Sequence, residues 1–326
     1  MSQTAWGIIG AARIAREQVI PAIRRADAGE VVAVSSASGK AGPYAEELAI
    51  ARAHDSHEAL LADPDVESVY IALPNGHHAE WIQRAARAGK HVLCEKPIVL
   101  GPAELDAVEA AAAEAGVVVE EAFMYRHHPQ LRVVRDLLAD GTLGDLVALE
   151  ARLHFTLDRV AGAGDLRLDP ALGGGSLLDV GCYPVDLFGL LTGAEPDGVA
   201  ASAVRDEPGG VDTRFAGVLR YGDVLSTFDA SFDSLFRGTA TIIGTRGSLT
   251  LADVFRADRT DGIGALVLET EEGTRELRPE GDQYAAQAAA FARLVRAGRR
   301  DEEHWRLTRY TTRTLDRLAA AARPDR

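Results

Sequence analysis

The stretch HVLCEKP, residues 91–97, decides how this chain is expected to fold. Its apolar centre is typical of a buried parallel strand, and the charges that follow would lie at the carboxyl edge of the sheet, where open α/β sheets bind ligands. Pro97 lacks an N–H and restricts Lys96 to extended conformations, which would give the ammonium group a fixed direction. From these residues alone, a surface lysine at a strand end is the alternative, and the Lys96–Pro97 bond can be cis or trans.

A glycine turn near the start of the chain indicates what the sheet edge binds. A predicted strand, residues 5–9, runs into a helical stretch, and Gly10, Ala12 and Ala15 occupy the three positions of the G-x-G-x-x-G/A fingerprint. In that fingerprint, backbone N–H groups and the helix N-terminus face a pyrophosphate. Ala12 departs from it, because its methyl group limits how closely the backbone approaches the diphosphate; an ordinary tight turn is the alternative. The expected contacts are Gly10, Ala12, Arg13 and Ile14.

The end of the second predicted strand, residues 30–34, bears on the choice of dinucleotide. NAD-preferring sites normally place Asp or Glu here to hold the ribose 2′-hydroxyl, and this chain has neither. The hydroxyls of Ser35 and Ser36 and the ammonium of Lys40 can instead receive a 2′-phosphate. We therefore expect NADP, with NAD possible, although Lys40 could also be simply solvated.

An alternating series of strands and helices continues to residue 121. The strand 66–72 leads into LPNGHH, residues 73–78, whose adjacent histidines lack both the one-face spacing of a helical metal pair and a nearby carboxylate or thiolate partner. We therefore expect no metal, and we interpret the loop as packing beside the nicotinamide. The predicted cofactor contacts here and at the opening stretch are Leu73, Pro74, Asn75, His78, Glu95 and Lys96. The series predicts a doubly wound parallel sheet, a Rossmann domain over residues 1–122.

Polar residues on one predicted helix, 176–191, form the second candidate site. Asp179, Tyr183 and Asp186 fall near i, i+4 and i+7, so they share one face, which would turn toward a polar cavity. From the residues alone, a solvated helix face is favoured. Arg167, in the loop before this helix, could anchor a substrate oxygen or form a structural ion pair.

The rest of the second half is rich in predicted strands. A long strand is expected at 145–158, a loop at 162–170, and further strands over 198–279 are separated by turns that contain glycine. Alternation of apolar residues along 215–221 implies one buried face and one freer face, which could carry a homodimer. The expected closing helices are 283–297 and 307–321.

Bulk composition places the chain among ordinary globular proteins. Its 326 residues are enough for two domains, and 47% hydrophobic with 26% charged residues is usual. The formal net charge of −14 argues against nucleic acid or an anionic membrane as a partner, although local N–H groups can still bind a phosphate. Two cysteines, no signal-peptide pattern and no apolar run of roughly 20 residues predict a cytoplasmic protein.

Several sequence blocks resemble those of the Gfo/Idh/MocA oxidoreductase family, and the resemblance covers nearly the whole chain. In the first half they are Gly7-Ile8-Ile9-Gly10 with Ile14-Ala15, Leu73-Pro74-Asn75 with His78, and Glu95-Lys96-Pro97. In the second half they are FMYRHHP, residues 123–129, and GGGSLLDVGCYP, residues 173–184. The combination resembles the branch that contains dimeric dihydrodiol dehydrogenase, D-xylose dehydrogenase and glucose–fructose oxidoreductase.

The resemblance implies a fold, a cofactor and a class of substrate. Family members bind NAD or NADP in the Rossmann domain, and they hold the substrate on an α+β domain with an open, mostly antiparallel sheet. That domain is expected at 123–326, with its C-terminal helix packed back on the first domain, and its sheet commonly forms homo-oligomers. The substrates are usually sugars, polyols or cyclic alcohols. The resemblance makes Lys96 catalytic, and Tyr183, where many members carry histidine, resembles the acid/base of the dihydrodiol dehydrogenase branch.

These implications lead to a hypothesis of reversible hydride transfer between the nicotinamide C4 and a secondary alcohol carbon. Tyrosine and lysine both have reference pKa values of about 10, so neither is an ideal base unaided, but an ammonium beside the phenol favours the phenolate. We assign Tyr183 as the acid/base and Lys96 as the charge that tunes it, with the reverse assignment left open. The expected substrate contacts are Lys96, Arg126, Arg167, Asp179 and Tyr183. The rival functions are a non-catalytic NADP(H) sensor and an enzyme that keeps its cofactor bound for internal redox.

Overall fold

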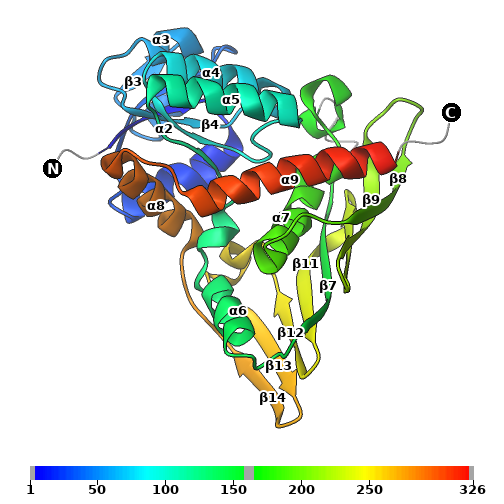
Figure 1. Cartoon of the computed structure of the whole chain (residues 1–326). Helices are drawn as coiled ribbons and strands as arrows, with labels where there is room; N and C mark the ends of the chain where they lie inside the picture. Colours follow the sequence, from blue (N-terminus) through cyan, green and yellow to red (C-terminus); the bar gives the residue numbers. More distant parts are fainter. Residues whose placement is uncertain (1–3, 158–164, 323–326) are drawn as a thin grey trace. The chain divides into compact units, whose positions relative to one another are not determined.

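The computed structural model describes residues 4–157 and 165–322, which form two compact units (Figure 1). The first unit comprises Met1–Met124 and Tyr284–Arg306, and the second comprises Tyr125–Gln283 and Leu307–Arg326. The predicted strand 145–158 and the predicted loop 162–170 both extend into residues outside the described part. The chain therefore leaves the first unit, builds most of the second, returns to the first at Tyr284, and re-enters the second at Leu307.

Six parallel strands form the sheet of the first unit, in the order β3-β2-β1-β4-β5-β6. They are β1 Ala5–Ile9, β2 Glu30–Ser35, β3 Arg52–His54, β4 Ser68–Ile71, β5 His91–Cys94 and β6 Val119–Glu121. This confirms the predicted doubly wound parallel sheet. Because the strand order reverses between β1 and β4, their carboxyl ends mark the topological switch point at which such sheets bind ligands.

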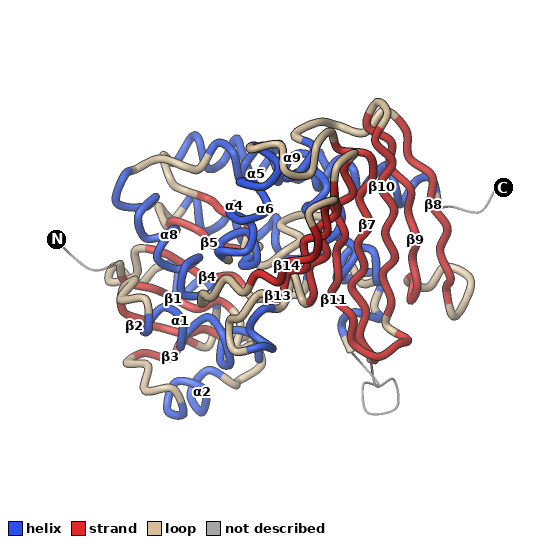
Figure 2. Tube along the Cα trace, turned by 90° about the horizontal axis from the view of Figure 1, so that it is seen from below, coloured by secondary structure: helices blue, strands red, loops and turns tan. Residues whose placement is uncertain are grey.

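Helices and helical turns connect these strands (Figure 2). They are η1 Ala15–Val19, α1 Ile20–Arg25, α2 Ala41–Glu47, α3 His57–Leu61, η2 Asn75–His77, α4 His78–Arg87 and α5 Pro102–Ala115. Most of α8 Gln283–Ala297, which comes later in the chain, also belongs to this unit. Local sequence explains the limits of α5. Pro102 lies in its first turn, where the missing N–H costs nothing, and Gly116 ends it in the left-handed conformation with φ 65°.

Apolar side chains cover both faces of the central strands in the first unit. All of β4 and the last three residues of β5 are buried, and Ile71, Val92 and Cys94 belong to one apolar core. Strands of a parallel sheet are buried on both faces, so their sequences are continuously apolar rather than alternating. The prediction from HVLCEKP is confirmed, because β5 ends at Cys94, directly before Glu95 and Lys96.

Eight strands form the sheet of the second unit, in the order β14-β13-β12-β11-β7-β10-β9-β8. They are β7 Leu146–Thr156, β8 Gly198–Arg205, β9 Asp212–Tyr221, β10 Val224–Ser231, β11 Asp233–Gly244, β12 Gly247–Ala252, β13 Ala265–Thr270 and β14 Gly273–Leu277. Neighbouring strands are antiparallel except β7 and β10, which are parallel. The open, mostly antiparallel sheet that the family resemblance implied is therefore confirmed.

The second unit also contains helical segments. They are η3 Met124–His127, α6 Pro129–Ala139, η4 Leu166–Leu168, η5 Pro170–Leu172, η6 Leu177–Gly181, α7 Cys182–Thr192, η7 Ala257–Thr260 and most of α9 Glu302–Ala321. Of these, α7 contacts β7 and β10. Along β9 the alternate residues Phe215, Gly217, Leu219 and Tyr221 are buried, and the residues between them are exposed, which confirms the predicted alternation.

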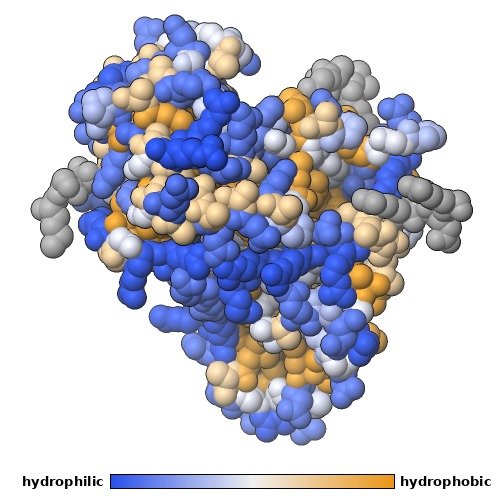
Figure 3. All heavy atoms as spheres, turned by 45° about the horizontal axis from the view of Figure 1, so that its top comes forward, coloured by the Kyte–Doolittle hydropathy of each residue, from blue (hydrophilic) through white to orange (hydrophobic). Residues whose placement is uncertain are grey.

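The described residues contain neither a membrane-spanning helix nor a cluster of metal-ligating side chains. Figure 3 shows a face that is largely hydrophilic, with smaller apolar areas between the polar side chains. None of the described helices is long and apolar enough to cross a membrane. Within residues 4–157 and 165–322, no group of three or more His, Cys, Asp or Glu side chains is arranged to hold a metal ion.

Candidate active site

The glycine turn after β1 requires glycine at its first position. Gly10 has φ +101°, a conformation that other residues rarely adopt, and a Cβ there would lie 2.6 Å from the carbonyl oxygen of Ala72. The N–H of Gly10 donates to the carbonyl of Ser35 at 3.1 Å. The turn is thus tied to β2 and passes close to the end of β4, at the switch point of the sheet.

Residues 11–14, which follow Gly10, are half-buried, except for the exposed Arg13. The carbonyl of Ala12 accepts a hydrogen bond from the hydroxyl of Tyr44 at 3.0 Å, and Ile14 is half-buried. The side chain of Arg13 is 74% exposed and lies 3.9 Å from Glu17. A turn that only glycine can make, followed by an exposed cation, fits a dinucleotide phosphate. Other predicted cofactor contacts, Leu73, Pro74 and Asn75, are half-buried in the loop that follows β4.

The hydroxyl groups at the end of β2 have unequal surroundings. Ser35 is fully buried, and its Oγ lies 2.8 Å from Nδ1 of His57. The Oγ atom of Ser36 lies 3.0 Å from that of Ser38, and Lys40 is exposed directly before α2. The structure therefore turns the hydroxyl of Ser35 inward and leaves Ser36 and Lys40 on the segment that follows β2.

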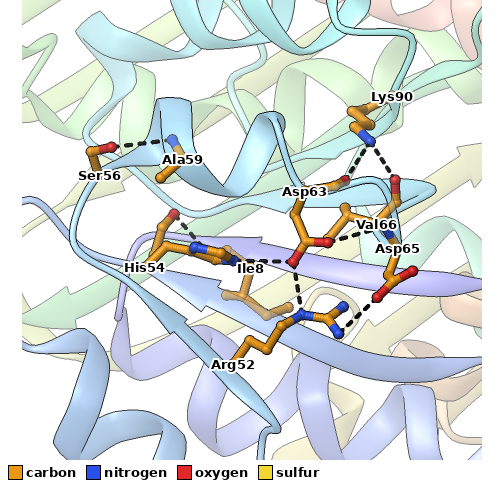
Figure 4. A network of polar contacts seen from close by, with 10 residues as sticks. Ile8, Arg52, His54, Ser56, Ala59, Asp63, Asp65, Val66 and Lys90 are labelled. Atoms are coloured by element: carbon orange, nitrogen blue, oxygen red, sulfur yellow. Dashed lines mark hydrogen bonds and ion pairs between the residues drawn. The ribbon is translucent and has the colours of Figure 1, made fainter.

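A polar network holds the edge strand β3 beside β2 (Figure 4). The carboxylate of Asp63 forms an ion pair with Arg52, 2.7 Å from its Nε, and lies 3.1 Å from Nε2 of His54. Burial alone would raise the pKa of Asp63, but hydrogen bonds from the Asp65 N–H, His54 and Arg52 outweigh it and hold the pKa below its ordinary value. Lys90 donates to the carbonyl of Asp63 at 2.9 Å. These contacts fix the edge of the sheet next to the predicted 2′-phosphate segment.

His78 joins the loops that follow β4 and β5. It is fully buried, with Nε2 2.8 Å from the carbonyl oxygen of Leu73 and Nδ1 2.8 Å from that of Pro97. Burial lowers the pKa of the imidazole, and a neutral ring can donate only one of these two hydrogen bonds. The Lys96–Pro97 peptide bond, which the sequence left open, is cis. Predicted as a cofactor contact, His78 has both ring nitrogens directed at backbone carbonyls.

Contacts on both sides of Lys96 fix the turn that carries it. The carboxylate of Glu95 accepts a hydrogen bond from the hydroxyl of Tyr70, which is completely buried. Burial and the Glu95 carboxylate both raise the pKa of Tyr70, so its hydroxyl stays protonated as the donor. On the other side, the N–H of Ile98 donates to Oε1 of Glu121 at 3.0 Å. The half-buried Lys96 therefore projects from a backbone that neighbouring strands hold in place.

In the second unit, Asp212 of β9 holds the start of the helical segment that carries Tyr183. The hydroxyl of Ser176 and the N–H of Leu177 donate to Oδ2 of Asp212 at 2.6 and 2.7 Å. Gly175 has φ +115°, and a Cβ there would lie 2.6 Å from Oδ1 of Asp212. The glycine run thus lets the backbone approach this carboxylate.

Tyr183 packs among aromatic rings on α7. Its side chain is 7% exposed, and its ring centroid lies 5.9 Å from that of Tyr125 and 5.5 Å from that of Phe255. Asp186, three residues later, is fully buried and forms an ion pair with Arg126, whose side chain is 2% exposed. Arg126 was predicted to bind substrate, and the structure places its guanidinium group on Asp186.

The two other predicted substrate contacts lie before α7. Arg167 lies 3.4 Å from Asp165 and 5.4 Å over the ring of Phe155, so it has the ion-pair partner that was the alternative interpretation. Its carbonyl accepts a hydrogen bond from the N–H of Gly175 at 2.9 Å. Asp179 is half-buried, and its N–H donates to the carbonyl of Gly175 at 3.0 Å.

Several polar residues that fix these segments, most of them buried, were not predicted from the sequence. They are Tyr70, His57, Glu121, Tyr125, Asp212 and Thr311. One of them had a usable signal: two glutamates end the apolar run 117–119, just as Glu95 and Lys96 end the run before them. The partners of the others lie far away in the sequence, so no local pattern marks them.

A parallel sheet with a glycine turn at its switch point, and a charged turn on the next strand, defines a dinucleotide-binding enzyme fold. Residues 4–123 match the family described as "Oxidoreductase family, NAD-binding Rossmann fold", and residues 131–250 match the "GFO/IDH/MocA C-terminal domain". The chain belongs to the Gfo/Idh/MocA family, as its sequence blocks predicted, and it is an NAD(P)-dependent oxidoreductase that acts on CH–OH groups.

Individual relatives support this assignment over the whole chain. D-xylose 1-dehydrogenase (NADP(+)) 2 of Haloferax volcanii is 37% identical over 325 residues, which is 97% of each chain. Trans-1,2-dihydrobenzene-1,2-diol dehydrogenase of Mus musculus is 34% identical over 246 residues, 74% of this chain and 72% of the relative. The crystal structure of a 3-ketoreductase from Actinomadura kijaniata, in complex with NADP and TDP-benzene, is 30% identical with a TM-score of 0.92, covering 99% of this chain and 98% of the other.

Proposed function

We propose that this chain oxidises, or in the reverse direction reduces, a carbon of a sugar or cyclic diol with NADP as its cofactor. The observation that carries the proposal is the Lys96 turn, where Tyr70 and Glu121 hold the residues on either side of the lysine. A rigid cation at the carboxyl edge of a Rossmann sheet suits a substrate oxygen. The names of two relatives, which specify D-xylose and a dihydrobenzenediol, support this class of substrate.

In this proposal Tyr183 moves the hydroxyl proton, and Lys96 polarises the substrate oxygen. The dinucleotide, when bound, supplies the hydride acceptor or donor at the nicotinamide C4. During oxidation the substrate O–H proton passes to the phenolate of Tyr183, the C–H hydride leaves the same carbon, and a C=O bond forms. The ammonium charge of Lys96 favours the phenolate over the neutral phenol. The reverse assignment, in which Lys96 gives the proton, predicts a smaller effect of removing the phenol hydroxyl.

Of the remaining predicted substrate contacts, we retain Asp179. It is half-buried, on the turn that leads into α7, and its carboxylate can accept a hydrogen bond from a substrate hydroxyl. The guanidinium groups of Arg126 and Arg167 face Asp186 and Asp165, so we assign them to the structure around the site.

The preference for NADP rests on the segment after β2. Residues 35–40 contain no carboxylate to repel a 2′-phosphate, and the side chains of Lys40 and Arg13 are exposed. Ser36 supplies a hydroxyl beside them, whereas that of Ser35 is occupied by His57. We therefore propose Ser36, Lys40 and Arg13 as the residues that distinguish NADP from NAD.

We further propose that residues 1–122 hold the cofactor and that residues 123–326 hold the substrate.

We also propose that the chain forms a homo-oligomer through the open face of the eight-stranded sheet. Val218 and Leu225, on the paired strands β9 and β10, are 43% and 52% exposed on that face. Light scattering after gel filtration should give a mass at least twice that of one chain, and Leu225→Glu should lower it. A monomer at all protein concentrations would contradict this.

Turnover is tested by mixing the protein and NADP⁺ with D-xylose or with trans-1,2-dihydrobenzene-1,2-diol and following the fluorescence of NADPH. We expect at least one of the two to be oxidised, and NADP⁺ to be used in preference to NAD⁺. Tight binding of NADPH without turnover of either compound would contradict the proposal and favour a non-catalytic sensor. Protein that retains its cofactor through dialysis, and reacts only when an oxidisable and a reducible sugar are both present, would indicate internal redox.

A further inference from the structure

A single buried carboxylate on α7 accepts hydrogen bonds from two other segments, η3 and α9. Asp186 is fully buried and accepts hydrogen bonds from Nε of Arg126 at 3.0 Å and from the hydroxyl of Thr311 at 2.9 Å. The second guanidinium nitrogen of Arg126 and the hydroxyl of Tyr125 donate to it as well. A buried carboxylate with a charged partner and two hydroxyl donors has a well-defined position, because losing any partner leaves a polar group unsatisfied.

Tyr125 links this carboxylate to the proposed acid/base. Its hydroxyl donates to Asp186, while its ring lies 5.9 Å from the ring of Tyr183 with 58° between the planes. Phe255 completes a cluster of three rings, 5.3 Å from Tyr125 and 5.5 Å from Tyr183. Tyr183 and Asp186 are three residues apart and therefore on the same side of α7. One side chain, that of Tyr125, thus touches both.

The rotation of α7 about its axis is fixed from α9 as well. A Cβ at Gly189 would lie 2.2 Å from the ring of Tyr310, so the two helices are in close contact there. That contact is made by the ring of Tyr310, whereas its hydroxyl meets the hydroxyl of Tyr221 on β9 and not α7. Thr311, next to Tyr310, supplies the hydrogen bond to Asp186. The helix that carries Tyr183 therefore has polar and steric contacts on consecutive turns.

We propose that Tyr125 and Asp186 are positioning residues for Tyr183, with Arg126 and Thr311 holding Asp186 in place. The inference rests on the proposed function, in which the phenol of Tyr183 transfers a proton. Proton transfer requires donor and acceptor atoms within hydrogen-bond reach, and a displacement of about 1 Å can cost on the order of 10²-fold in rate. Tyr125 restricts the position of the Tyr183 ring by direct contact, and Asp186 restricts the rotation of α7, the helix that carries Tyr183.

Two tyrosines offer a matched comparison. Tyr125→Phe and Tyr221→Phe each remove one hydroxyl from a buried phenol in the second unit, but only the first loses a hydrogen bond to Asp186. The assay uses whichever of the two test compounds the protein oxidises. We expect Tyr125→Phe to lower kcat about tenfold and to leave the KM for NADP⁺ within about twofold. We also expect a larger kinetic isotope effect when the substrate carries deuterium at the carbon that is oxidised. Tyr221→Phe should lose similar thermal stability but keep kcat within about twofold.

Two variants of Thr311, which donates to the other carboxylate oxygen of Asp186, provide a loss-and-rescue comparison. Thr311→Val removes the hydroxyl at constant shape and should lower kcat several-fold, whereas Thr311→Ser keeps the hydroxyl and should restore it. A role confined to stability predicts that all these variants share the kcat of the unchanged protein below their melting temperatures. That result, with equal kcat for Tyr125→Phe and Tyr221→Phe, would overturn the inference.

The outcome separates this inference from the function on which it rests. A Tyr183→Phe protein with full activity would reject the proposed role of Tyr183. A slow Tyr183→Phe protein together with a fully active Tyr125→Phe protein would reject only the positioning role. If the unchanged protein oxidises neither test compound, the proposed function fails. Amide hydrogen exchange over α7 then tests the positioning role without a substrate. Faster exchange in Tyr125→Phe than in Tyr221→Phe supports that role, and equal exchange overturns it.

Discussion

Nδ1 of His78 lies 2.8 Å from the carbonyl oxygen of Pro97, the residue that follows Lys96. The other ring nitrogen, Nε2, lies 2.8 Å from the carbonyl oxygen of Leu73, so one buried imidazole connects the loops after β4 and β5. The direction of the Lys96 side chain therefore depends on a residue from a different element of the sheet.

Replacing His78 by alanine should disturb the Lys96 turn. The variant removes the hydrogen bond that the neutral ring donates to one of these buried carbonyl groups and the packing of the ring between the loops, so we expect the free energy of unfolding to fall by roughly 1–3 kcal/mol and kcat to fall on the order of tenfold. His77→Ala is the matched control, because His77 is the adjacent residue and is exposed. Denaturant unfolding and steady-state kinetics measure both effects. Equal behaviour of the two variants would show that His78 does not hold the turn.

Acid should destabilise the protein through its buried histidines. Burial lowers the pKa of His57, His78, His91 and His128. Unfolded histidine titrates near pH ~6.5, so below that pH the unfolded chain binds more protons than the folded one. The stabilising contribution is thus complete above pH ~6.5 and is lost as the pH falls through the folded-state pKa values. Urea unfolding on either side of this pH should show a lower midpoint in acid, and a constant or higher midpoint would contradict the assignment.

Gly10 should tolerate no side chain. In Gly10→Ala the new methyl group would clash with the carbonyl oxygen of Ala72 at 2.6 Å, so we expect NADPH affinity to fall at least tenfold, or about 1.4 kcal/mol. Gly89→Ala is the control, because Gly89 has φ +73° with nothing within 4 Å of its Cβ position. It should lose about 1–2 kcal/mol of stability from the backbone conformation alone and keep its affinity. Fluorescence titration with NADPH distinguishes the two variants.

The choice of cofactor should respond to charge on the segment after β2. Ser38→Asp places a carboxylate on an exposed position beside Ser36, where it would repel a 2′-phosphate and accept from a 2′-hydroxyl. We expect the ratio of kcat/KM for NADP⁺ to that for NAD⁺ to fall about 10²-fold in this variant, and about tenfold in Lys40→Ala. Arg25→Ala, which removes an exposed cation elsewhere in the unit, should leave the ratio unchanged. An unaltered ratio in Ser38→Asp would place the 2′-phosphate elsewhere.

The parallel sheet could be predicted from the sequence because its central strands carry a strong local signal. Continuous apolar runs that end in charges, such as 91–96, mark strands buried on both faces. The short edge strand β3 gave no such signal. Its sequence is Arg-Ala-His, and it is held by polar contacts from Arg52 and His54 to Asp63, which lies nine residues or more away in the chain.

The sequence predicted which residues belong to the candidate site better than it predicted the tertiary partners of those residues. Spacing placed Tyr183 and Asp186 on one side of a helix, yet the buried pairing of Asp186 with Arg126 joins residues that are 60 positions apart. Similarly, Ser35 ends an apolar strand, and nothing in the local sequence shows that its hydroxyl turns inward to His57. Motifs identify which residues gather at the edge of a sheet, whereas the tertiary partner decides which of them remain available to a ligand.

The central claim, that Tyr183 exchanges the proton of the substrate, is tested most directly by the kcat of Tyr183→Phe. Removing the phenol hydroxyl while keeping the ring should lower kcat by on the order of 10²–10⁴ and leave the dissociation constant of NADPH within about twofold. A Tyr183→Phe enzyme that turns over its substrate at the unchanged rate would contradict the account.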